Sequence, residues 1–327
     1  MILTEKELTA ITCGAVRTWT ANEEFHACRF TEKQTEFYAR KNGGELLKKA
    51  HATSSIKLDF ITDASAFSFD WFMREASSRR FYHFDFYVDG VMTDHFDAEK
   101  TTACGRGHAS FSIPEGKHHV TLYLPNLMMT TLYNVELTDA TFIEPVKKSR
   151  KFYFLGDSIT QGYDAIYPSM SYVNRIANIM DAEVLNQAIG SEIFDENILD
   201  PALPYQPELV VIAYGTNDWA RCKTHEEFLD GAKRFFRRAI ELFPESQIVY
   251  ISPIFRGETE KDNSPVGEFF SCAKELGALA EALGIYHIDG QKLVPHLPAF
   301  YSDLTLHPND MGFSFYAENF VRAICTF

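Results

Sequence analysis

The spacing of apolar residues changes partway along this chain of 327 residues, and the change divides it into two parts. Up to about residue 140, apolar and polar residues alternate in short runs, as in Phe67, Phe69 and Trp71. This alternation is typical of strands with one buried face and one face in water. Beyond residue 150 the apolar runs are continuous, as in strands that are covered on both faces. The chain therefore combines two architectures.

The first part has the turn signals of an antiparallel protein. Asp89-Gly90 lies between two strand-like runs and is a strong signal for a two-residue hairpin, and Glu115-Gly116 predicts a second hairpin. No convincing long helical pattern interrupts these runs. We therefore predict an antiparallel β-sandwich, jelly-roll-like, over residues 1–142, followed by a linker at 143–150.

The second part alternates strands with helices. Continuous apolar runs at 209–215, 247–252 and 285–289 are separated by amphipathic patterns, the longest over residues 224–243. This alternation predicts an α/β domain over residues 151–327, with a parallel sheet in three α/β/α layers. Such sheets carry their functional sites at the carboxyl ends of the strands.

Charge and cysteine usage limit the partners. The net charge of −14 argues against nucleic acid or an anionic membrane surface as the main partner, and it suits a neutral ligand such as a sugar. No apolar run approaches the roughly 20 residues that span a bilayer. The six cysteines form no CxxC pair, and the first residues do not resemble a secretory signal. The expected location is therefore the cytoplasm; the oligomeric state is not set by the sequence.

Polar clusters follow the predicted strands of the second part where a site is expected. They are Gly156-Asp157-Ser158, Asn186 to Ser191, Gly215 to Trp219, and Asp303 to Asn309 before the last helix. Each cluster alone is a common turn or helix cap. Together they supply what acyl transfer needs. Ser158 is a candidate nucleophile, His307 a candidate base, and backbone N–H groups with the Asn217 amide are candidate donors to an oxyanion.

The motifs GDSIT, GTND and the late Asp303, His307-Pro-Asn resemble, in matching order, the signature blocks of the SGNH (GDSL) hydrolase superfamily. The resemblance covers about residues 150–327. It implies a flavodoxin-like sheet, with Ser158 as nucleophile and His307 as general base. It also implies that the Ser158 N–H and the Asn217 side chain donate to the oxyanion. The GxSxG elbow of α/β-hydrolases is absent.

Two departures from the family pattern leave alternatives open. The second block usually ends in N-x-x-x-x-G; here Ser191 occupies the last position and Gly190 precedes it, so either residue could supply the oxyanion N–H. The acid and histidine are usually spaced D-x-x-H, whereas Asp303 lies four residues before His307. A helical turn would bring either spacing together, so a triad with Asp303 and a Ser–His dyad are both possible.

The two-part layout is similar to family two of the carbohydrate esterases, which deacetylate sugars, some with a dyad. The resemblance implies a serine esterase that hydrolyses short acetyl esters of carbohydrates through an acyl-enzyme. Trp219 is expected either to stack on a sugar ring or to belong to the core.

Three other functions are weaker. A lipid or thioester acylhydrolase would need an apolar groove beside Ser158, and no continuous apolar loop lies near the motifs. An inactive carbohydrate-binding protein would most simply have lost one of Ser158, Asn217 and His307, which are all present. A nucleotide binder would need a glycine-rich phosphate loop, which is absent.

No cofactor or metal site is predicted. His118 and His119 are adjacent on a predicted strand and would point to opposite faces, and His287 with Asp289 is interpreted as structural. The expected partner is a small-molecule or oligosaccharide ester.

Overall fold

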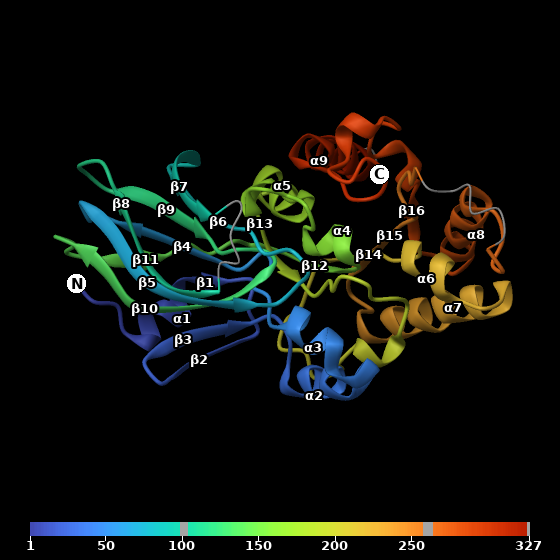
Figure 1. The fold of residues 1–327 in the computed structure, drawn as a ribbon, viewed down its shortest axis with the longest axis horizontal. Helices are drawn as coiled ribbons and strands as arrows, with labels where there is room; N and C mark the ends of the chain where they lie inside the picture. Colours follow the sequence, from blue (N-terminus) through green and yellow to red (C-terminus); the bar gives the residue numbers. More distant parts are fainter. Residues whose placement is uncertain (99–103, 258–263, 326–327) are drawn as a thin grey trace. The chain divides into compact units, whose positions relative to one another are not determined.

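The computed structural model describes residues 1–98, 104–257 and 264–325 and divides the chain into two compact units (Figure 1). Unit 1 comprises residues 1–149 with 166–169, and unit 2 comprises residues 150–165 with 170–327. A short segment beyond the first strand of the second part therefore belongs to unit 1. In the described part of the chain, no helix has the length and apolarity that crossing a bilayer would need.

Unit 1 contains two antiparallel sheets, as the alternating runs predict. One sheet has the order β1 (Thr12–Cys13), β4 (Lys57–Thr62), β9 (His118–Tyr123), β6 (Tyr82–Val88) and β7 (Val91–Ala98), with β11 (Ile143–Pro145) on β4. The other has the order β2 (Arg17–Ala21), β3 (Glu24–Cys28), β10 (Met128–Thr138), β5 (Ala66–Glu75) and β8 (Gly105–Ser112). Three short helices accompany them: α1 (Glu5–Ile11), α2 (Glu32–Arg40) and α3 (Glu45–Ala50).

The inner faces of the two sheets share one apolar core. Phe69 of β5 and Phe84 of β6 are both fully buried, and their ring centroids lie 5.2 Å apart. The intervening residues of each strand face away from this core, which is the arrangement of a β-sandwich.

The β6–β7 hairpin turns at Asp89-Gly90 and contains a β-bulge. Tyr87 pairs with Met92, but Phe86 pairs with Asp94, so Thr93 is an extra residue in β7. The bulge shifts the pairing by one residue, which exchanges the faces of everything beyond it. Phe96 consequently packs against the core.

Part of the predicted linker is strand. Ile143–Pro145 forms β11, which pairs antiparallel with β4, and Arg150 already begins β12. The connection is therefore limited to residues 146–149. A strand of three residues is too short for an alternating pattern to appear in the sequence.

Unit 2 contains the expected parallel sheet. Its strands follow the order β13 (Ala182–Asn186), β12 (Arg150–Gly156), β14 (Leu209–Ala213), β15 (Gln247–Ile251) and β16 (Tyr286–Ile288), all paired in parallel. This order is that of a flavodoxin-like sheet. Its helices are α4 (Ser158–Gln161), α5 (Tyr172–Ile179), α6 (Thr216–Arg221), α7 (His225–Leu242), α8 (Phe269–Ala282) and α9 (Asp310–Cys325).

Short 3-10 helices complete the described elements of the chain: η1 (Lys41–Gly44), η2 (Pro168–Met170), η3 (Glu196–Ile198), η4 (Gly290–Lys292) and η5 (Pro298–Phe300).

Helices cover both faces of this sheet, which explains the lack of alternation in its strands. Phe154 of β12 packs against Tyr172 of α5, while the preceding Tyr153 packs against Phe243 at the end of α7. Tyr172 in turn stacks on Tyr316 of α9 at 3.9 Å, so α5 and α9 share one face. The three-layer α/β/α fold class predicted from the sequence is confirmed.

Candidate active site

The stretch after β12 places a serine at the start of a short helix. Asp157 caps α4, since its carboxylate accepts a hydrogen bond of 2.9 Å from the N–H of Ile159. Gly156 ends the strand where a Cβ atom would lie 2.2 Å from Oγ1 of Thr160. The glycine and the acid thus build the turn, and Ser158, 8% exposed, is left at the carboxyl end of the strand.

Ser158 is the first member of a hydrogen-bonded series of three side chains. Its Oγ atom lies 2.9 Å from Nε2 of His307, and Nδ1 of His307 lies 2.7 Å from Oδ2 of Asp303. A serine, a histidine and a carboxylate in this order form the arrangement that activates a serine hydroxyl by a general base. The structure therefore brings together the three residues predicted to be catalytic.

From the sequence, a helical turn was considered for Asp303 and His307. The structure instead places both residues in a loop. It is closed by a bridge between Tyr301 and Pro308, and Ser302 donates its N–H to the carbonyl of His307 at 2.8 Å. Inside this loop, Oδ1 of Asp303 accepts backbone N–H groups from Thr305, Leu306 and His307 at 2.7–3.1 Å. The chain folds around the carboxylate, which accounts for the four-residue spacing.

These contacts keep Asp303 ionised. Burial opposes its ionisation, but the hydrogen bonds from the His307 side chain and from three backbone N–H groups outweigh burial. They hold the pKa of Asp303 well below its usual range. A carboxylate that stays charged can fix the histidine tautomer and stabilise the imidazolium form.

Two neighbours of His307 were not found from the sequence. Oδ2 of Asp164 lies 3.8 Å from Nδ1 of His307, so a second carboxylate faces the same nitrogen. The ring of Tyr163 stacks on the imidazole with centroids 5.7 Å apart. Asp164, Asp303 and His307 are close enough to hold an ion. However, Asp303 already accepts hydrogen bonds from Nδ1 of His307 and from three backbone N–H groups. These contacts suit a carboxylate that orients His307 better than one that binds an ion.

The proposed oxyanion donors lie on loops that flank the serine. Because β12 runs between β13 and β14, the loops after those strands lie on either side of Ser158. The two loops are joined directly, since Nδ2 of Asn217 donates to the carbonyl of Glu192 at 3.0 Å. The position of Asn217 suits an oxyanion donor, a role that stays a prediction.

Gly190 and Ser191 differ in how their backbones are used. The N–H of Gly190 donates to Oε1 of Gln161 at 2.7 Å. Ser191 has a φ of 75°, in the left-handed region that glycine adopts most readily. Ser191 thus holds the conformation that explains a glycine at this position in the family pattern.

Buried acids lie beneath these loops. Burial raises the pKa of Asp157 to about 6, against the opposing hydrogen bond from Ile159. Burial also raises the pKa of Asp218 to about 7, although its Oδ1 atom accepts the N–H of Phe194 at 2.9 Å. The negative charges of Asp157 and Glu192 add to this upward shift for Asp218. Neither shift could be foreseen from the sequence, because both acids occupy ordinary turn and cap positions.

Trp219 does not have the exposed ring that stacking on a sugar requires. Its side chain is 4% exposed, its indole N–H donates to the carbonyl of Gly267, and its ring meets Phe269 edge-on at 5.1 Å. The guanidinium of Arg256 lies over the ring at 5.3 Å. These contacts argue against the predicted sugar contact and fit the alternative of a core residue.

Comparisons with known proteins find a matching family model and similar solved structures. Residues 154–314 match the model of the GDSL-like lipase/acylhydrolase family. No curated protein sequence gives a match. The salicylyl-acyltransferase SsfX3 from a tetracycline biosynthetic pathway is 21% identical, with a TM-score of 0.79 over 96% of this chain and 94% of its own.

Two further solved structures resemble the whole chain or most of it. A Bacteroides ovatus protein described as a GDSL-like lipase is 16% identical, with a TM-score of 0.75 over 100% of this chain and 97% of its own. A family two carbohydrate esterase from Clostridium thermocellum, in complex with cellohexaose, is 18% identical. Its TM-score is 0.62 over 84% of this chain and 93% of its own. At these identities the likeness establishes the fold.

Proposed function

We propose that the chain is an ester hydrolase of the SGNH type that removes short acyl groups, acetyl above all, from carbohydrates. Residues 154–314 match the model of the GDSL-like lipase/acylhydrolase family, which supports this chemistry. The observation that carries the proposal is the series of hydrogen bonds from Oγ of Ser158 through His307 to Asp303. A serine hydroxyl, an imidazole and a carboxylate in this order are the groups that transfer an acyl group through serine.

Catalysis begins with attack of Ser158 Oγ on the ester carbonyl while Nε2 of His307 takes the hydroxyl proton. The imidazolium is stabilised by the carboxylate of Asp303. The oxyanion accepts hydrogen bonds from the N–H of Ser158 and the amide of Asn217, with a third from the backbone of Ser191. His307 then returns the proton to the departing sugar oxygen, which leaves an acyl-enzyme. Water, deprotonated by His307, releases the acid and restores Ser158.

A carbohydrate substrate is supported by two observations. The structural likeness to a family two carbohydrate esterase extends over 84% of this chain, so it includes much of the sandwich as well as the parallel-sheet domain. The net charge of −14 suits a neutral ligand better than a fatty acid anion or an acyl thioester of a phosphorylated carrier.

Acyl transfer is a second candidate. The likeness to a salicylyl-acyltransferase has a higher TM-score, 0.79, and covers 96% of this chain. The two activities share the acyl-enzyme and differ only in whether water or an acceptor hydroxyl attacks it. The same residues serve both, so the acceptor decides between them.

The test is hydrolysis of nitrophenyl esters of two to twelve carbons by the full chain, followed by acetate release from acetylated xylo- and cello-oligosaccharides. We expect the two-carbon ester to be fastest, and the Ser158→Ala protein to give the background rate. A rate that climbs towards eight or more carbons would instead indicate a lipase-like enzyme. Acylated product formed on adding acceptor alcohols would indicate transfer, and binding without turnover of any ester would indicate a binding protein.

A further inference from the structure

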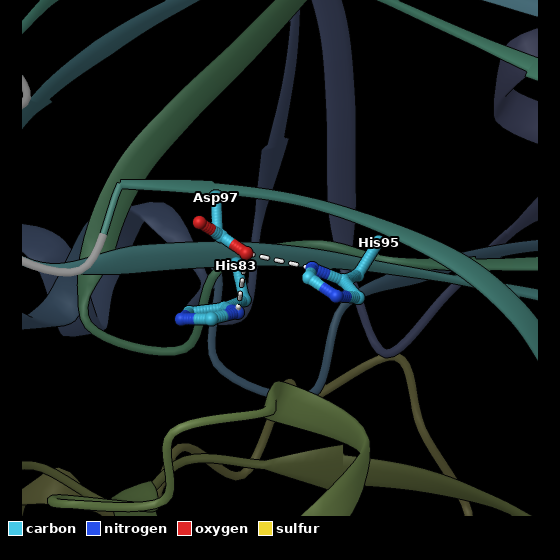
Figure 2. Close-up of side chains that lie close together, drawn as sticks. All are labelled: His83, His95 and Asp97. Carbon is cyan, nitrogen blue, oxygen red and sulfur yellow. Dashed lines mark ion pairs between the residues drawn. The ribbon is translucent and has the colours of Figure 1, made fainter.

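The β6–β7 hairpin of unit 1 carries a cluster of two histidines and one aspartate (Figure 2). One oxygen of Asp97 lies 2.6 Å from Nδ1 of His95 and 3.6 Å from Nδ1 of His83. One potential ligand atom from each of the three residues lies within 4.8 Å of the others. The cluster shares no residue with the candidate active site.

The register of the hairpin creates this cluster. His83 of β6 pairs directly with Asp97 of β7, and His95 is two residues before Asp97, so all three lie on one face. The opposite face of the same strands packs Phe84 and Phe96 into the sandwich core. The cluster therefore lies on the outer face of the sheet, on backbone that the core holds in place.

A short segment covers the cluster from the other side. The ring of Tyr167 lies 4.9 Å from that of His83 and 5.6 Å from that of His95, edge-on to both. The segment is fastened to β6, since the N–H of Ser169 donates to Asp85 at 2.8 Å and the hydroxyl of Tyr87 donates to Ser169 at 3.0 Å. His83 is only 1% exposed, whereas the side chain of His95 is 43% exposed, which leaves an approach from solvent.

The ligand types and their spacing suit a divalent transition metal. Two imidazole nitrogens and a carboxylate oxygen are donors that zinc prefers, and a hard cation such as magnesium prefers oxygen alone. Atoms bound at about 2.0–2.1 Å to a tetrahedral zinc ion lie about 3.3 Å from one another. The 3.6 Å separation of Asp97 and His83 is close to this value, and the 2.6 Å contact with His95 has to lengthen slightly when an ion replaces the shared proton.

Two other histidine–carboxylate pairs of unit 1 lack the second histidine that the cluster has. His108 with Asp70 and His118 with Asp89 are each one imidazole on one carboxylate. Within residues 1–98, 104–257 and 264–325, the other cluster of three possible ligands is Asp164, Asp303 and His307. We propose that His83, His95 and Asp97 form a binding site for a divalent transition metal ion, zinc foremost, with water at the fourth position.

Such an ion would join the two strands of the hairpin at its open end and fix the position of β7, which is the edge strand of its sheet. The site does not depend on the proposed esterase function. Its expected effect is a gain in stability, because an ion that binds only the folded chain shifts the folding equilibrium.

The test uses the full chain, stripped with EDTA and dialysed, and titrated with zinc chloride against a chromophoric chelator. We expect one zinc ion per chain and a rise in Tm on adding zinc. The variants His95→Ala and Asp97→Asn should each weaken this binding by at least about 10-fold and abolish the rise in Tm. Magnesium chloride should give neither effect. His95 and Asp97 are chosen because His83 is buried and its replacement risks the fold.

The matched control is His108→Ala, which removes an exposed histidine from a single pair and should leave zinc binding unchanged. The proposal is overturned if the stripped protein binds no zinc at micromolar concentrations, or if His95→Ala and Asp97→Asn bind it as tightly as the parent. It is also overturned if the only zinc bound is lost in Asp164→Asn, because the ion would then lie at His307.

Discussion

Asp303 lies four residues before His307, yet its Oδ2 atom is 2.7 Å from Nδ1 of the imidazole. The other carboxylate oxygen accepts three backbone N–H groups of the same loop, including that of His307 itself. One side chain thus shapes the loop with one oxygen and faces the histidine with the other. The two tasks can be separated by substitution, because an asparagine keeps one oxygen acceptor and loses the charge.

Asp303→Asn should lower kcat by about 10⁴, the loss that amide replacement of the equivalent carboxylate causes in a serine protease, because the wrong tautomer of His307 is favoured. His307→Ala should cost about 10³-fold or more, since Ser158 then has no base. The measurement is kcat for nitrophenyl acetate, with circular dichroism to verify the fold. An effect of Asp303→Asn within about tenfold would support a Ser158–His307 dyad, with Asp164 able to supply the missing charge.

Asn217→Ala should reduce kcat by about 10²–10³ and change KM little, because the amide is proposed to bind charge that exists only in the transition state. The control is Asn197→Ala, which removes another asparagine side chain, one whose amide nitrogen donates to Oδ1 of Asp195 at 2.9 Å. A change confined to KM would identify Asn217 as a contact to the substrate ground state.

Ser191→Gly should retain activity and raise the free energy of unfolding by about 1 kcal/mol, because glycine adopts a φ of 75° without strain. Ser191→Ala should also retain activity if only the backbone N–H is used. Gly190→Ala should lower kcat, since the new Cβ atom would lie 2.8 Å from the ring of Tyr163, which stacks on His307. Steady-state kinetics and thermal unfolding separate these effects; a large loss in Ser191→Ala would assign a role to the hydroxyl.

Asp218→Asn should become more stable relative to the parent as the pH rises. Burial raises the pKa of Asp218 to about 7, so between about pH 4 and pH 7 the folded chain binds a proton that the unfolded chain has lost. The parent therefore loses stability across this window, by a total on the order of 2–4 kcal/mol, whereas the neutral amide does not titrate. Tm values of both proteins at pH 5 and pH 8 test this, and parallel pH profiles would contradict it.

The fold could be predicted because the burial of a strand, on one face or on both, determines the spacing of apolar residues in its sequence. Strands covered on one face alternate, as β5 does, and strands covered on both faces do not, as β14 does not. Ser158 and His307 could be chosen as a candidate nucleophile and base because each stands in a short motif next to a strand or helix end. These features are local, and a local pattern needs no knowledge of the partners that pack against it.

What the sequence could not predict depends on contacts between distant segments. Trp219 follows a signature motif, but its position is decided by Phe269 and Arg256. Asp164 reaches His307 only because the loops after β12 and before α9 meet. The pKa of Asp218 is raised because the fold buries its side chain, and the nearby charges of Asp157 and Glu192 add to the shift. No spacing rule links these pairs.

The pairing register of the β6–β7 hairpin could not be predicted for a different reason. Asp89-Gly90 correctly predicts the turn, and counting outwards from it would place His83 opposite Phe96. The bulge at Thr93 moves Asp97 into that place. It arises because Phe96 has to face the core, where it packs against Trp71 and Tyr82.

Removal of Thr93 alone would exchange the two faces of β7 beyond the bulge. Phe96 would turn towards solvent and His95 towards the sandwich core, while the turn at Asp89-Gly90 would prevent the strand from slipping back into register. The sequence would still contain all three ligand residues, in the same order. The binding capacity of this face is therefore a property of strand length, and an ancestor or relative could gain or lose it by a single insertion or deletion without any change of ligand.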